Sequence, residues 1–174
     1  ELALVHSTRY LDMIFGMLDG HDFADGKLVQ LDGDTYAGPD SLEAALRGVG
    51  AALIGVDKVM SGRERAVFSA MRPPGHHAEP ELAMGFCLFS NAAIAACHAM
   101  KRWAAKRVAV LDFDVHHGNG TQAAFWNEPH LFYASSHQMP LYPGTGAPEE
   151  RGAFENIRNL PLAEGAGGED FLAG

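Results

Sequence analysis

The feature that most constrains this chain is the segment of residues 108–121, which reads VAVLDFDVHHGNGT. An apolar run typical of a buried strand leads into two aspartates and two histidines and then breaks at glycines. Because side chains alternate between the two faces of a strand, Asp112, Asp114 and His116 should project to the same side. A carboxylate and an imidazole two positions apart at a strand end could bind one metal ion together.

A second histidine pair, His76 and His77, lies in a loop rich in glycine and proline at residues 72–78 (RPPGHHA). Both histidine loops follow segments that we expect to be strands. Strands and helices alternate along the chain, which predicts an α/β fold with a mainly parallel central sheet between helical layers, and such sheets place their sites at the carboxyl ends of the strands. Both loops should therefore open at one edge.

The remaining elements are predicted from periodicity and from capping residues. The run at 108–115 is continuously apolar, as in a strand buried on both faces. The other expected elements are helices at 10–18 (capped by Ser7 or Thr8), 40–60, 91–103 and 121–126, and strands at 66–71, 131–136 and 156–162.

Composition excludes some classes of function. The chain has 174 residues and a formal net charge of −9, which argues against nucleic acid as the main partner because phosphate binding needs a basic face. Its apolar runs are too short to span a membrane. Cys87 and Cys97 form no metal or redox motif, so we expect reduced thiols and a cytoplasmic location. Residues 1–174 should form a single domain, or part of one, because the start at Glu1 suggests a fragment.

The residue types also suggest how a site would work. A catalytic zinc site usually has three protein ligands and an open position. Asp114 and His116 are the candidates for two ligands. Asp112 would not bind the zinc directly but would orient a neighbouring histidine. Zinc would polarise a carbonyl group and lower the pKa of a bound water, while His76 and His77 would act as general base and general acid.

Each of these features has an alternative. An Asp-x-Asp pair at a strand end also occurs in magnesium-dependent haloacid-dehalogenase phosphatases, although His116 stands where those enzymes prefer Thr or Val. A histidine pair in a loop can be incidental. His6, His21, His98 and His130 are predicted to be structural or exposed, and His137 ends a strand near the expected site.

Taken together, four segments resemble the histone deacetylase family, which has the arginase/deacetylase fold. They are residues 72–78, 85–91 (GFCLFSN), 111–122 (LDFDVHHGNGTQ) and 142–146 (YPGTG), and they occur in the family's order. The ending Asn119-Gly-Thr-Gln122 resembles class II enzymes and their bacterial relatives.

The resemblance implies zinc on Asp114 and His116, catalysis by His76 and His77, and a second ion, potassium. It also implies a narrow tunnel for the acyl chain and a rim aspartate that receives the substrate's backbone amides. The implied residues are Gly85, Phe86 and Tyr142 for the tunnel, Asp34 for the rim, and Asp112, Asp114, His116, Ser135 and Ser136 for potassium.

The chain departs from the family pattern at several positions. Asp112 can back His76, but the partner expected for His77 is the neutral Asn119, so we expect His77 to be mostly neutral at pH 7. Tyr142 stands where Phe is common. The family's third zinc ligand, an aspartate, and its carbonyl-polarising tyrosine have no match, since Asp170 is the only later aspartate and no tyrosine follows Tyr142.

We therefore expect a zinc-dependent amidohydrolase that removes acetyl or other acyl groups from lysine or a related amine, with a domain that is incomplete at its C-terminus and inactive by itself. An acetylpolyamine amidohydrolase is one alternative, and a non-catalytic module that binds acyl-lysine or docks a partner is another. The expected partners are an acetylated lysine peptide or a small acetylated amine, without nucleic acid or membrane.

Overall fold

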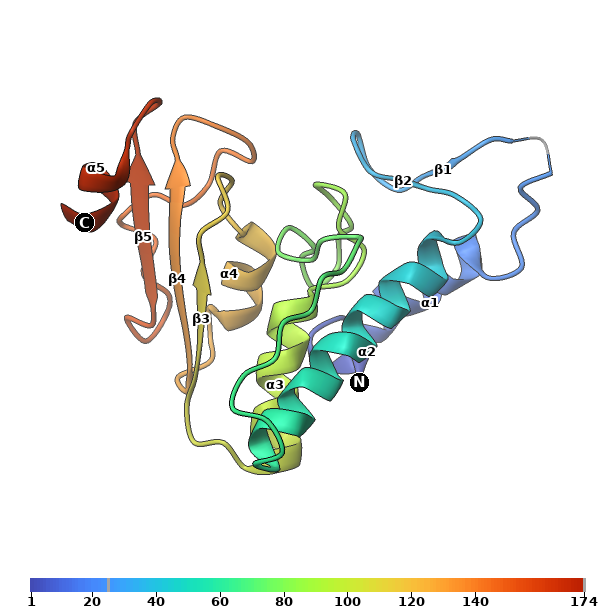
Figure 1. The fold of residues 1–174 in the computed structure, drawn as a ribbon. Helices are drawn as coiled ribbons and strands as arrows, with labels where there is room; N and C mark the ends of the chain where they lie inside the picture. The colour runs from blue at the N-terminus through green and yellow to red at the C-terminus, as the bar shows by residue number, and fades with distance from the viewer. Residues whose placement is uncertain (25, 174) are drawn as a thin grey trace.

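The computed structural model describes residues 1–24 and 26–173, and its larger sheet has three parallel strands. The strands β3 (Val108–Asp112), β4 (Leu131–Gln138) and β5 (Ile157–Leu162) lie side by side in that order (Figure 1). Helix α4 (Asn119–Phe125) connects β3 to β4, which makes the strand–helix–strand unit that a parallel pair requires. The predicted α/β class with a parallel sheet is confirmed.

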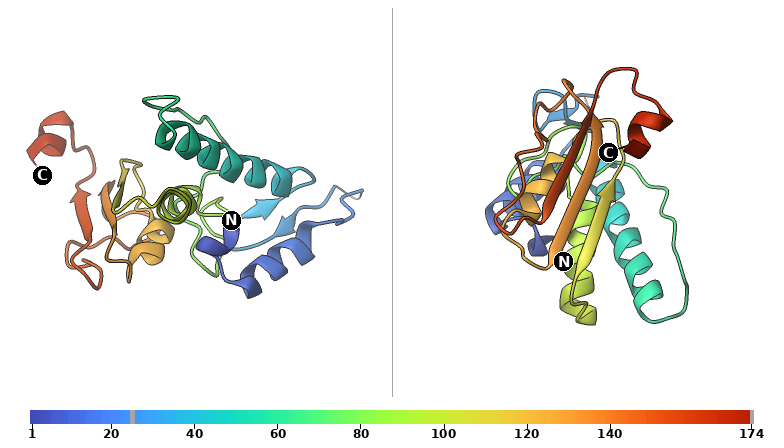
Figure 2. Two further views of the ribbon diagram at one scale, coloured as in Figure 1. Left: turned by 90° about the horizontal axis from the view of Figure 1, so that it is seen from below. Right: turned by 90° about the vertical axis from the view of Figure 1, so that its left-hand side faces the viewer.

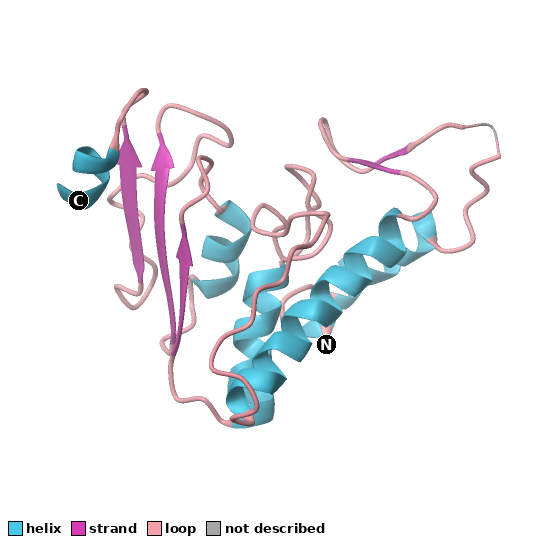
Figure 3. Ribbon diagram, viewed as in Figure 1, coloured by secondary structure: helices cyan, strands magenta, loops and turns pink. Residues whose placement is uncertain are grey.

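Helix α3 (Asn91–Trp103) contacts both the sheet and helix α2 (Ser41–Met60), so it stands between the sheet and the N-terminal helices (Figures 1 and 2). The N-terminal part contains a short 3-10 helix, η1 (Leu2–Leu4), and helix α1 (Thr8–Leu18). Ser7 caps α1 as predicted, because its hydroxyl accepts the backbone N–H of Tyr10. Helix α5 (Gly168–Ala173) lies beyond β5, away from the other helices (Figure 3).

Two apolar cores hold the helices and the sheet together. The first joins α1, α2 and the segment before α3, and the second lies between α3, α4 and one face of the sheet. Each fully buried aliphatic or aromatic side chain contributes about 2 kcal/mol of burial free energy. The buried members are Tyr10, Ile14, Leu18, Ala37, Ala45, Val49, Ala83, Leu88, Phe89 and Ile94 in the first core, and Ala93, Ala96, Phe125, Leu131, Tyr133 and Ile157 in the second.

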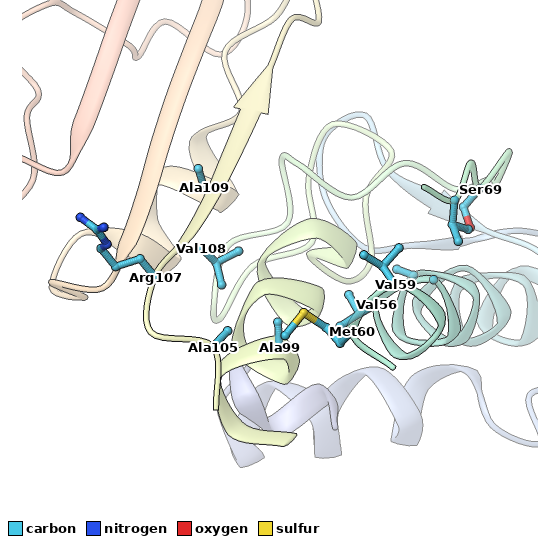
Figure 4. A pocket seen from close by; sticks show the side chains of 12 residues that line it. Val56, Val59, Met60, Ser69, Ala99, Ala105, Arg107, Val108 and Ala109 are labelled. Atoms are coloured by element: carbon cyan, nitrogen blue, oxygen red, sulfur yellow. The ribbon is translucent and has the colours of Figure 1, made fainter. Parts of the chain in front are cut away.

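The strand predicted at 66–71 is wrong. These residues form an irregular segment that lies along α2, where Val67 and Met71 side chains approach the helix at Gly55 and Gly48. An open apolar groove of about 520 Å³ separates the segment from β3, with Ser69 on one side and Val108 on the other (Figure 4), and Val67 also lines it. A strand needs a hydrogen-bonded neighbour, and no described strand pairs with this segment.

The other predicted elements differ less from the observed ones. The strand predicted at 108–115 ends at Asp112, and it is not buried on both faces, since Leu111 is 69% exposed. Buried residues alternate along β4 with exposed or half-buried ones, because only one face of the sheet packs against α3 and α4. The polar loop after α1 contains a small antiparallel pair, β1 (Val29–Gln30) and β2 (Tyr36–Ala37), that the sequence did not predict.

Within the described residues, no helix is both long enough and apolar enough to cross a membrane. The two cysteines, Cys87 and Cys97, are both free thiols. Burial raises the pKa of the Cys87 thiol to about 12, so this side chain is a buried, unreactive group rather than a nucleophile.

Candidate active site

The two histidine loops meet at the carboxyl end of β3. The rings of His76 and His77 lie 4.0 Å apart between their centres, and the His77 ring lies 5.9 Å from that of His116. Tyr142, from the loop after β4, places its ring edge-to-face at 5.1 Å from His77. Parallel strands end at a common edge, which is why segments far apart in the sequence converge here.

His76 is held by the carboxylate of Asp112. The Nδ1 atom of His76 lies 2.9 Å from Oδ2 of Asp112, and the same oxygen accepts the hydroxyl of Tyr133 at 3.0 Å. The other carboxylate oxygen accepts the backbone N–H of Asp114. Burial raises the pKa of Asp112, but hydrogen bonds from His76, Asp114 and Tyr133, together with the charge of His76, outweigh it and lower the pKa overall. Asp112 is thus a stable anion behind His76.

Sequence reasoning missed Tyr133. It is fully buried on β4, and its hydroxyl also accepts the backbone N–H of Gly118 at 3.1 Å. The register pairs Val110 of β3 with Tyr133, and Asp112 with Ser135. Side chains alternate along β4, so the sequence could have shown that Tyr133 and Ser135 lie on the same face. The hydrogen bond from Tyr133 to Asp112 depends in addition on the register of the two strands, which the sequence does not show.

His77 is held by a neutral side chain instead. Its Nδ1 atom lies 2.9 Å from Oδ1 of Asn119, and both residues are buried. Burial lowers the pKa of His77, and the neighbouring charge of His76 lowers it further, while the hydrogen bond to Asn119 only partly opposes this. The direction agrees with the prediction that His77 is neutral at pH 7.

Asp114 and His116 lie beside the histidine pair. Oδ1 of Asp114 accepts the backbone N–H of His116 at 2.8 Å and lies 3.2 Å from its Nδ1 atom, and both side chains are partly exposed. A carboxylate and an imidazole are donors that zinc accepts, but a catalytic site usually takes three protein ligands. The described residues contain no group of three His, Cys, Asp or Glu side chains that could hold a metal. Asp170, in the first turn of α5, instead accepts the N–H of Gly167.

Two of the expected tunnel residues, Gly85 and Tyr142, lie against the His77 ring. Gly85 and Phe86 both have positive φ angles, 57° and 66°, and Phe86 is 64% exposed. A Cβ atom at Gly85 would collide with the ring of His77, so glycine is required for this close approach. Asp34 accepts the backbone N–H of Gly85 at 3.1 Å, and the adjacent Thr35 hydroxyl accepts that of Phe86. The Asp34 carboxylate therefore supports the Gly85–Phe86 turn.

Tyr142 approaches Asp34 from the other side. Burial, together with the negative charges of Asp34 and Asp32, raises the pKa of Tyr142 to about 12. A hydrogen bond between the Tyr142 hydroxyl and the Asp34 carboxylate contributes to the same shift. Asp34 thus joins the turn at Gly85 and the ring of Tyr142, two parts of the expected tunnel wall.

The loop that carries Tyr142 is anchored from behind by buried polar groups. His117 bonds to the Thr145 hydroxyl at 2.7 Å and to Gln122 at 3.0 Å, and Glu150 accepts the backbone N–H groups of Gly146 and Ala147. Burial lowers the pKa of His117 to about 4, so its ring is neutral at pH 7. These contacts explain why a loop can hold an aromatic side chain in a fixed place.

The serines expected near potassium lie on β4. Ser135 is buried, and its hydroxyl lies 2.9 Å from Nδ1 of His137, while Ser136 is half-buried with its side chain on the opposite face. His137 is buried and bonds to the carbonyl of Gly146, which makes it structural. His6 and His98 are likewise buried and hydrogen-bonded, and His21 and His130 are exposed, as predicted.

Comparison with known proteins decides the family. The profile described as "Histone deacetylase domain" matches residues 1–174. The chain belongs to the histone deacetylase family. This membership displaces the haloacid-dehalogenase alternative.

Individual relatives agree with this assignment. The chain is 41% identical to histone deacetylase 14, chloroplastic, of Arabidopsis thaliana, covering 96% of the chain and 41% of the relative. It is 40% identical to the histone deacetylase-like amidohydrolase of Pseudomonas aeruginosa, covering 99% and 45%. The crystal structure of the HDA15 HD domain superposes with a TM-score of 0.83 at 37% identity, over 92% of the chain and 45% of that structure. The chain thus spans about half the length, or less, of these relatives.

Proposed function

We propose that the protein containing this chain is a zinc-dependent amidohydrolase that removes an acetyl or related acyl group from lysine or a similar amine. Membership of the deacetylase family supports a hydrolase of this kind. The observation that carries the proposal is the pair of imidazoles, His76 and His77, each with Nδ1 against an oxygen acceptor, Asp112 and Asn119, beside the Asp114 and His116 pair.

We assign one proton transfer to each of the two histidines. Because Nδ1 of each ring faces an oxygen acceptor, it carries the hydrogen, which leaves Nε2 as the basic nitrogen. His77, whose pKa is lowered by burial, is neutral at pH 7 and takes a proton from the attacking water at this atom. His76 is backed by the Asp112 carboxylate, and we assign it to protonate the departing amine.

Asp114 and His116 would hold zinc together with a ligand from outside the described residues. Zinc supplies Lewis-acid activation of the acyl carbonyl and of water when it is bound. The third ligand and a carbonyl-polarising tyrosine are proposed to lie outside these 174 residues, so we expect the 174 residues alone to bind metal weakly and to lack activity. Potassium is proposed to bind near Asp112 and Ser135, through carbonyl oxygens of Asp114 and His116, with Ser136 next to Ser135 on β4.

The tunnel residues suit a linear acyl-amine chain. Phe86 supplies an exposed aromatic side chain, Tyr142 supplies a second one edge-to-face with His77, and Gly85 keeps the backbone close to the His77 ring. Asp34 is proposed as a rim residue, although Gly85 and Thr35 already donate to its carboxylate. An acetylated lysine peptide and a small acetylated amine both fit this description, and an acetylpolyamine amidohydrolase is the alternative within the same chemistry. A cytoplasmic location stays a prediction.

The experiment is turnover of a fluorogenic acetyl-lysine substrate by the intact protein, with and without zinc. His77→Ala should lower kcat by at least about 100-fold, the usual contribution of a general base. His130→Ala, which changes an exposed histidine outside the site, is the matched control and should leave turnover unchanged. Tight binding of an acetyl-lysine peptide without turnover would support the non-catalytic module instead.

A further inference from the structure

We propose that Glu79 is a positioning residue, which fixes the orientation of the Asn119 amide and, through it, the tautomer of His77. The inference rests on the proposed role of His77 as the base. Oε1 of Glu79 lies 2.7 Å from Nδ2 of Asn119, and Oδ1 of Asn119 lies 2.9 Å from Nδ1 of His77. The three side chains therefore form a line that leads from a half-buried carboxylate to a buried imidazole.

The partners of Asn119 determine which way its amide faces. Besides Glu79, the Nδ2 atom also contacts the Met84 sulfur at 3.3 Å. An ionised carboxylate and a thioether accept hydrogen bonds and cannot donate them, so both require the NH2 group on their side. Reversing the amide would place two oxygen atoms 2.7 Å apart in a buried place, which is strongly repulsive.

The orientation of Asn119 then determines the state of His77. The amide oxygen can only accept, so Nδ1 of His77 must carry the hydrogen and Nε2 keeps its lone pair. In the reversed orientation the NH2 group would face Nδ1, which would favour the tautomer with the hydrogen on Nε2. That tautomer has no lone pair on Nε2 and cannot accept the proton of the attacking water there.

The comparison with His76 shows why only one of the two histidines needs this support. Asp112 presents two oxygen atoms, so it accepts from His76 whichever way the carboxylate is turned. Asn119 is asymmetric, and an asymmetric partner holds the right tautomer only if another group orients it. Glu79 is itself fixed, since its backbone N–H and carbonyl both pair with Leu82.

The test is a graded series at position 79 in the intact zinc-loaded protein. Glu79→Gln keeps an acceptor oxygen and should retain kcat within about twofold of the unchanged protein. Glu79→Ala removes the orienting group and should give a mixture of His77 tautomers in ¹⁵N NMR spectra. Glu79→Lys offers a donor, which favours the reversed amide, and should lower kcat about tenfold or more with KM unchanged, because charge-assisted hydrogen bonds bias an orientation by at least that factor. Glu81→Ala, an exposed neighbour, is the control.

The decisive comparison repeats Glu79→Lys in an Asn119→Asp background. A carboxylate at position 119 needs no orienting, so Glu79→Lys should no longer lower kcat relative to Asn119→Asp alone. An equal loss in both backgrounds, or an unchanged His77 tautomer in Glu79→Ala, would overturn the proposal. The NMR measurement of the His77 tautomer does not require turnover, so it tests the positioning role of Glu79 separately from the proposed function. The proposed function fails if His77→Ala keeps full activity. If Glu79→Lys does not fold, the NMR result for Glu79→Ala decides.

Discussion

The substitution Tyr133→Phe removes one hydroxyl from the support of His76 and leaves the ring packing in place. The Tyr133 hydroxyl donates to Oδ2 of Asp112 at 3.0 Å and accepts the N–H of Gly118 at 3.1 Å, and the residue is fully buried. Phenylalanine fills the same volume, so the change in the free energy of unfolding reports on these two hydrogen bonds and not on a cavity.

The expected loss of stability follows from the two hydrogen-bond partners of the Tyr133 hydroxyl, Asp112 and Gly118. A hydrogen bond to a charged group contributes about 1.5–3 kcal/mol, and a buried N–H left without an acceptor costs about 1–3 kcal/mol. We therefore expect Tyr133→Phe to lower the free energy of unfolding by about 3 kcal/mol at pH 7. Tyr10→Phe is the matched control, because among the described residues the similarly buried Tyr10 hydroxyl makes a single neutral hydrogen bond, to the carbonyl of Leu88, and its loss should cost about 1 kcal/mol.

The assay is urea denaturation of both variants, followed by circular dichroism. The pH dependence adds a second check. The pKa of Asp112 in the folded protein lies below its ordinary value of 3.8, so its stabilising contribution is present above that value and is lost as the pH falls through the folded pKa. The Tyr133→Phe penalty should be complete at pH 7 and shrink only below about pH 3.8. A penalty under 1 kcal/mol, or one no larger than that of Tyr10→Phe, would refute the reasoning.

Three further predictions concern the tunnel and the thiols. Gly85→Ala should destabilise the protein by about 2 kcal/mol or more in the same urea assay, because an alanine at φ 57° places its Cβ against the His77 ring; full stability would contradict the close approach. Tyr142→Phe keeps the aromatic contact with His77 but removes the hydroxyl beside Asp34, so kcat should change less than about threefold while Tyr142→Ala lowers it further. Cys87 should not react with Ellman's reagent in the native protein at pH 8, and should react once urea exposes it; rapid native labelling of Cys87 would show that the thiol is accessible.

Local signals predicted most of the secondary structure. The apolar periodicity of α2 and the cap at Ser7 indicate helices because the helix period and the helix ends depend on neighbouring residues alone. The segment 66–71 has the composition of a strand, but a strand also requires a partner, and a groove separates this segment from β3. Composition therefore predicted a conformation that the tertiary contacts did not support.

The sequence by itself determined the chemistry of this protein: two histidine pairs, the alternating Asp112, Asp114 and His116, and a neutral Asn119 where a carboxylate is common. Those residue types fix which groups can accept protons or bind a metal. Only the tertiary structure decided which of them lie close together. Tyr133 reaches Asp112 through the register of β3 and β4, and Glu79 reaches Asn119 across 40 residues. Such contacts depend on how strands pair and loops pack, which no local pattern specifies.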